Sequence, residues 1–107
     1  MNSEFDRIWN DIKSNYNLTT SISYGRGDNW RGYYEWTSNT IVIPIQTKML
    51  GIDVPYMIHE AIHAALKHKV NIHDEQFITL ENSLLKRYGV RGIHRYTEGV
   101  AILKRKR

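Results

Sequence analysis

Residues 59 to 63 read His59-Glu60-Ala61-Ile62-His63, and the interpretation of the whole chain starts from this stretch. The residues in and around it are good helix formers, so it is predicted to lie in an α-helix. Two side chains four positions apart then project from one face of that helix, one turn above each other. Imidazoles at this spacing can bind one Zn²⁺ ion together and leave other positions of the ion open.

Glu60 adds a catalytic group to this pair. It follows the first histidine, so it can reach a water molecule on the ion and remove a proton from it. The pattern is that of the zinc-dependent peptidases, whereas a structural zinc site has no use for such a carboxylate. The competing interpretation is an amphipathic helix whose histidines face solvent. We expect Zn²⁺ as cofactor, with His59 and His63 as ligands and Glu60 as the catalytic residue.

The composition restricts the class of protein. Residues 1–107 are expected to form a single domain, because the chain is short. The absence of cysteine excludes disulfides, Cys-type zinc fingers and thiol nucleophiles. The N-terminus lacks a signal pattern, and no apolar run reaches the roughly 18 residues of a membrane span. We therefore expect an intracellular, cytoplasmic protein that does not contact a membrane.

The positive charge of the chain gathers at its end. The formal net charge is +4, and residues 104–107 read Lys-Arg-Lys-Arg. A solvated tail is one interpretation of this segment. A contact to DNA through the phosphates is the other, and it would weaken steeply as salt rises.

The pattern of apolar and turn-forming residues predicts one helix, then strands, then two helices. Pro44 cannot donate to a strand ladder, so the strand that contains it is predicted to lie at the edge of the sheet or to fray at Pro44, and to line a cleft with the motif helix. The expected class is α+β and zincin-like, with a short antiparallel sheet of about three strands packed on that helix. The helices are predicted at residues 3–15, 54–69 and 74–88, the last capped by Asp74 and stopped by Gly89, and the strands at 18–24, 33–36, 40–45 and 99–103.

A zinc hydrolase needs a third protein ligand, and the chain offers three candidates. His68 is nine residues from His59, which places it on the opposite face of a continuing helix, so it is predicted to be a solvated surface residue. His73 comes after the predicted helix end, where the chain can turn back. Glu81 falls at the centre of the apolar stripe of the last helix, where a lone carboxylate needs a charged partner. It could be the third ligand, accept the second N–H of a ligating histidine, or pair with a Lys or Arg.

The segment from His73 to Phe77 resembles part of a known protein family. A third histidine after the motif, with an aromatic residue four positions later, is similar to the SprT-like (Spartan-type) zinc metallopeptidases. The resemblance covers roughly residues 24–89. It implies a zinc-dependent endopeptidase with His73 as third ligand, acting on protein or peptide substrates that include DNA-associated proteins. Two features depart from the family: Asp74 stands where glycine is usual, and the chain cannot form a Cys-rich zinc ribbon.

Other interpretations stay open. With Glu81 as third ligand the chain would resemble a minimal gluzincin instead. A nucleic-acid-binding or interaction protein could also keep a zincin scaffold without turnover. Nothing in the sequence selects the residue that stabilises the oxyanion from the candidates Tyr56, Tyr88, Arg91 and His94.

Overall fold

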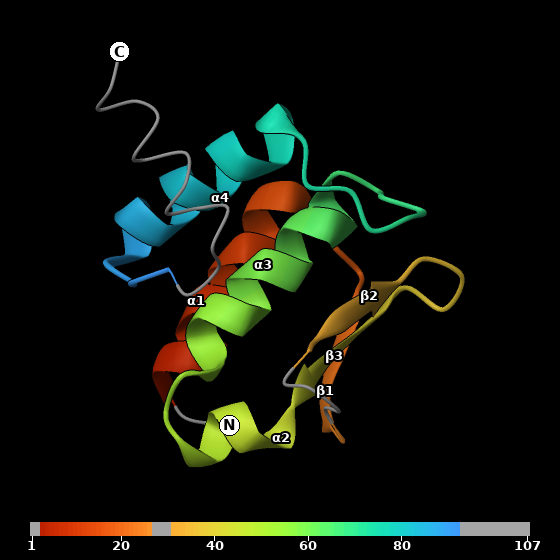
Figure 1. Cartoon of the computed structure of the whole chain (residues 1–107). Helices are drawn as coiled ribbons and strands as arrows, with labels where there is room; N and C mark the ends of the chain where they lie inside the picture. Colours follow the sequence, from red (N-terminus) through yellow and green to blue (C-terminus); the bar gives the residue numbers. More distant parts are fainter. Residues whose placement is uncertain (1–2, 27–30, 93–107) are drawn as a thin grey trace.

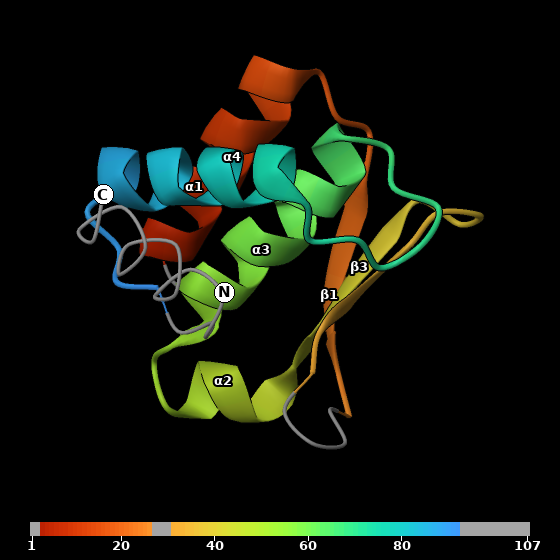
Figure 2. The ribbon, with the colours of Figure 1, turned by 45° about the horizontal axis from the view of Figure 1, so that its top comes forward.

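The computed structural model describes residues 3–26 and 31–92, which form an α+β fold (Figure 1). A small sheet lies on one side of the central helix α3, and α1 and α4 pack on other sides of it (Figures 1 and 2). The elements in chain order are α1 (Ser3–Tyr16), β1 (Ser21–Gly25), β2 (Tyr33–Glu35), β3 (Thr40–Pro44), α2 (Ile45–Met49), α3 (Asp53–Ala65) and α4 (Glu75–Tyr88).

The core forms where α3 meets its neighbours. The predicted apolar stripe of α1 is buried against α3, with Phe5, Ile8 and Ile12 fully buried. Helix α3 is buried along almost its whole length, because it contacts α1, α4 and two strands. Polar side chains on such a helix lie inside the protein, which is unusual unless they have partners or a function.

The ends of α4 agree with the prediction. The side chain of Asp74 caps the helix by accepting a hydrogen bond from the Phe77 amide at 2.9 Å. Gly89 ends it in the left-handed conformation with φ 65°, which glycine adopts without steric strain.

The sheet is mixed, so the prediction of an antiparallel sheet was wrong. The strand order is β1-β3-β2, with β3 parallel to β1 and antiparallel to β2. Residues 36–39 form the turn between β2 and β3. Strand β3 occupies the centre because its Ile41 and Ile43 are fully buried, whereas no residue of β1 or β2 is.

The edge position predicted for the strand at 40–45 was therefore also wrong. Pro44 is the last residue of β3, where the chain turns directly into α2, so its missing N–H interrupts no interior ladder position. The edges of the sheet are β1 and β2. Helix α2 begins at Ile45, the last residue of the strand predicted at 40–45.

The motif helix ends at Ala65, four residues earlier than predicted. Leu66 is its C-cap, and Lys67 has φ 56°, a left-handed value that is uncommon for a residue with a side chain. The chain turns back there, and the His68 amide donates to the His63 carbonyl at 3.0 Å.

None of the helices in residues 3–26 and 31–92 has the length and apolar character needed to cross a membrane. The predicted strand at 99–103 and the basic tail at 104–107 lie outside the described residues.

Candidate metal centre

Three histidines meet beside the middle of the fold. His59 and His63 project from the same face of α3, one turn apart, and both are buried, with 5% and 3% of their surface exposed. His73 reaches them from the segment between α3 and α4 and is half-buried. Together these residues form a group that could hold a metal ion.

The spacing of the ring nitrogens fits a single ion. The Nε2 atom of His73 lies 3.1 Å from Nε2 of His59 and 3.3 Å from Nε2 of His63. Zinc–nitrogen bonds of about 2.0–2.1 Å in a tetrahedral arrangement separate two ligand nitrogens by roughly 3.3–3.4 Å. The three Nε2 atoms therefore lie about where one tetrahedral ion would need them.

The protonation of His59 and His73 also suits a metal. Burial, followed by repulsion from His73, lowers the pKa of His59 to about 3. Burial also lowers the pKa of His73, which the charge of Glu81 partly opposes. Neutral imidazoles keep the lone pairs that a metal ion needs.

The second nitrogen of His59 is bound by Glu81. Nδ1 of His59 lies 2.8 Å from Oε2 of Glu81, a carboxylate that is fully buried. With Nε2 directed to the metal position, Nδ1 carries the proton and donates a hydrogen bond to the carboxylate. This contact accounts for a carboxylate in an apolar stripe. It also places Glu81 behind a ligand rather than in the ligand group with His73.

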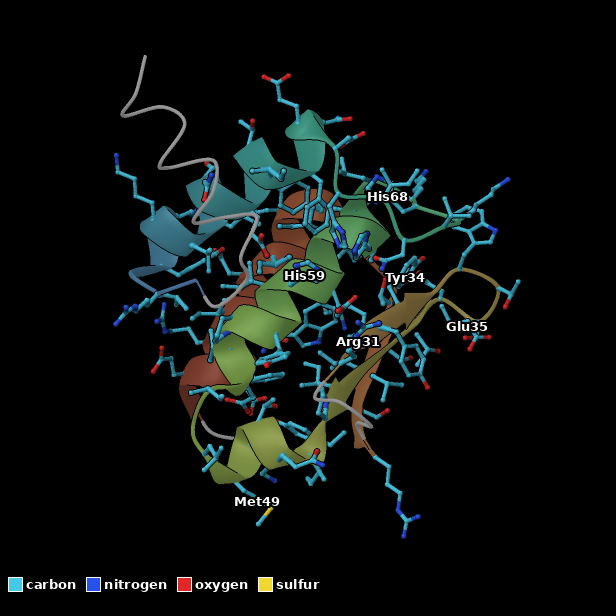
Figure 3. The ribbon with its side chains drawn as sticks, viewed as in Figure 1. Arg31, Tyr34, Glu35, Met49, His59 and His68 are labelled. Atoms are coloured by element: carbon cyan, nitrogen blue, oxygen red, sulfur yellow. The ribbon has the colours of Figure 1, made fainter. Side chains whose placement is uncertain are left out.

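The second nitrogen of His63 is bound by His68. Their Nδ1 atoms lie 2.9 Å apart, so His63 donates and His68 accepts when Nε2 of His63 faces the metal position. The prediction of a solvated His68 on the opposite helix face was wrong, because α3 ends before this residue (Figure 3). The left-handed turn at Lys67 brings His68 back, and no glycine marked that turn in the sequence.

Phe77 forms an apolar wall for the cluster. Its ring is fully buried, and its centroid lies 4.4 Å from that of His63 and 4.9 Å from those of His59 and His73. A wall of this kind keeps water from that side of the rings and limits their rotation.

Glu60 lies beside the cluster on the side of the sheet. It is 5% exposed, and burial, followed by the charge of Glu81, raises the pKa of its carboxyl to about 8. The backbone of Gly32 approaches it closely. A Cβ atom at position 32 would lie 3.0 Å from the Val42 carbonyl oxygen and 3.3 Å from Oε2 of Glu60. The sequence did not single out Gly32, because no local pattern of residues shows that its backbone comes close to Glu60.

A pocket opens at this point. Its volume is about 350 Å³, and Glu60 and His63 are among its lining residues. One side is formed by residues 31–34, which lead into and begin β2, and the other by residues 68–71 of the loop after α3. Figure 3 shows Arg31 and Tyr34 on the sheet side and His68 at the loop. The cleft thus runs along β2, not along the strand at 40–45 as predicted.

The oxyanion candidates are not gathered at the pocket. The Tyr88 hydroxyl donates to Asp11 on α1, and Arg91 lines a separate pocket at the start of α3. Tyr56 is half-buried on α3, one turn before Glu60, and burial raises its pKa. His94 lies outside the described residues.

Comparison with known proteins finds no similar family, protein or structure: no family model, no curated protein and no solved structure matches the chain.

Proposed function

We propose that the protein is a zinc-dependent endopeptidase in which Glu60 acts as the general base. The observation that carries the proposal is the convergence of three Nε2 atoms at one-ion spacing, with the buried carboxyl group of Glu60 in the same pocket lining as His63. The similarity of the motif and of His73 and Phe77 to SprT-like metallopeptidases supports the same chemistry. His59, His63 and His73 are the proposed ligands.

Each residue of the proposed site has a separate chemical role. A zinc ion held by the three histidines would lower the pKa of its water to about 7 and polarise the peptide carbonyl. The positive charge of that ion would favour the ionised form of Glu60, which would take a proton from the attacking water and deliver it to the leaving amine nitrogen. Glu81 and His68 hold the ligand rings in the tautomer that directs Nε2 inward.

The substrate is proposed to bind as an extended peptide along β2. Among the described strands, β2 pairs only with β3, so its outer edge is available for backbone hydrogen bonds. The pocket beside Glu60 borders this strand. A peptide on this edge would pass the proposed catalytic residue.

Contact of the basic tail with DNA, and thus a DNA-associated substrate, is a further proposal from charge alone. It concerns residues outside those described. An intracellular location likewise stays a prediction.

The decisive experiment replaces Glu60 by Gln. Glu60→Gln should retain about one zinc ion per chain and lose roughly 10²- to 10⁴-fold in turnover, because the amide cannot accept the proton. Zinc content is measured by elemental analysis, and turnover by cleavage of a fluorescently labelled unfolded protein. Glu75→Gln, on the exposed first turn of α4, is the matched control and should behave as wild type.

Two results would count against the proposal. A zinc-loaded Glu60→Gln variant with wild-type turnover would exclude Glu60 as the base. A wild-type protein that binds no zinc after reconstitution would exclude the metal centre itself.

A further inference from the structure

The pocket beside Glu60 carries more positive than negative charge. Arg31 lines it on the side of β2, and Lys69 lines it on the side of the loop after α3. Glu60 is the only carboxylate among the described residues that line it. A metal ion in the centre would add further positive charge at the same place.

Neither cation is paired with a carboxylate of the described residues. Within residues 3–26 and 31–92, ion pairs join His59 to Glu81 and Arg87 to Asp11, and neither Arg31 nor Lys69 takes part in one. The Lys69 ammonium lies 5.2 Å from the centroid of the Trp36 ring. This cation–π contact positions the charge over the turn between β2 and β3.

Tyr34 in the pocket lining does not offset this charge. Burial raises the pKa of Tyr34, so its hydroxyl stays neutral. That hydroxyl lies 3.1 Å from Oδ1 of Asn39 and donates to it, which directs it to the turn.

We propose that this pocket binds a carboxylate of the peptide substrate, close to the bond that is cleaved. The proposal rests on the proposed peptidase function and names the substrate class for it. A volume of about 350 Å³ has ample room for an acidic side chain. Because Glu60 and His63 also line the pocket, an occupant would lie next to the reacting carbonyl. The carboxylate can be an Asp or Glu side chain, or the terminal carboxylate of the substrate.

The first test compares peptides that differ at one position. A series carries Glu, Gln or Lys at each of the three positions on either side of the cleaved bond, with free or amidated C-termini. At one position kcat/KM should be higher for Glu than for Gln, roughly threefold for each exposed cation involved, and lowest for Lys. A preference that vanishes on amidation would assign the pocket to the terminal carboxylate, and one that persists would assign it to a side chain.

Charge reversal identifies the residues responsible. Lys69→Glu and Arg31→Glu should each lower cleavage of the Glu peptide and raise that of the Lys peptide. Lys86→Glu, which reverses an exposed charge near the end of α4, should leave the ratio unchanged. If wild type cleaves Glu and Gln peptides equally and Lys69→Glu and Arg31→Glu leave the ratio unaltered, the proposed pocket is excluded while the peptidase proposal stands.

A binding measurement separates the two proposals. Affinities of the Glu and Gln peptides are measured by fluorescence anisotropy with the Glu60→Gln variant in the presence of zinc. Tighter binding of the Glu peptide, reduced by Lys69→Glu, supports the pocket. It does so even if wild type cleaves no peptide, because the lack of cleavage would contradict only the peptidase proposal. Equal affinities overturn the pocket.

Discussion

At the scale of single residues, the site depends on how each imidazole uses its two nitrogens. All three cluster histidines direct Nε2 to the shared centre. Two of them also bind a partner through Nδ1. The partner of His59 is Glu81, and the partner of His63 is His68. Such contacts orient a ligand before the metal arrives, so removing one weakens metal binding without removing a ligand.

The first prediction concerns His68. His68→Ala should weaken zinc affinity roughly 10- to 100-fold, because the Nδ1–H of His63 loses its acceptor. Affinity is measured by competition with a chelating dye, and circular dichroism checks that the fold is kept. Lys67→Ala, at the neighbouring exposed position, is the control for changes in the loop. Equal zinc affinities of His68→Ala and wild type would contradict the role of His68.

At the scale of elements, the start of α4 connects stability to the site. Asp74 caps the helix and directly follows His73, while Phe77 and Glu81 lie one and two turns further along. The cap therefore sets the place where the chain leaves the metal centre and the helix begins. The aspartate that departs from the SprT-like pattern has a structural explanation here.

The second prediction tests this cap. Asp74→Ala should lower the free energy of unfolding by about 1 kcal/mol, because the amide of Phe77 loses its acceptor. It should also weaken zinc binding, because His73 is the residue just before the cap. Urea denaturation and zinc titration measure the two effects. Asp74→Asn keeps a side-chain oxygen and should behave nearly as wild type, so equal losses in both variants would refute a capping role.

At the scale of the whole molecule, the proposed ion would join parts of the chain that are separated in sequence. His59 and His63 come from α3, and His73 comes from the segment that leads into α4. A ligand that binds the folded state and not the unfolded chain stabilises the fold by mass action.

The third prediction follows from this linkage. Free zinc at 100 times its Kd should add about 2.7 kcal/mol to the free energy of unfolding. For a chain of this size the melting temperature should rise by roughly 10 °C. Differential scanning fluorimetry with zinc and with a chelator measures the shift. His73→Ala should lose most of this shift. A wild-type melting temperature that changes with neither zinc nor the chelator would argue against a metal centre.

The sequence by itself determined the features that depend on neighbours a few residues away. The spacing of His59 and His63 is set by helical geometry, and the ends of α4 are set by the capping chemistry of Asp74 and Gly89. The α+β class and the candidate ligand His73 followed from the same local patterns.

Only the tertiary structure decided the features that join distant residues. β3 became central because its isoleucines are buried where the strand meets α3, and Pro44 did not prevent this because it is the last residue of the strand. The approach of Gly32 to Glu60 and the contact of His68 with His63 depend on where β2 and the end of α3 pack. Strand order and helix termination of this kind are set by the packing of the whole core, which local periodicity does not encode.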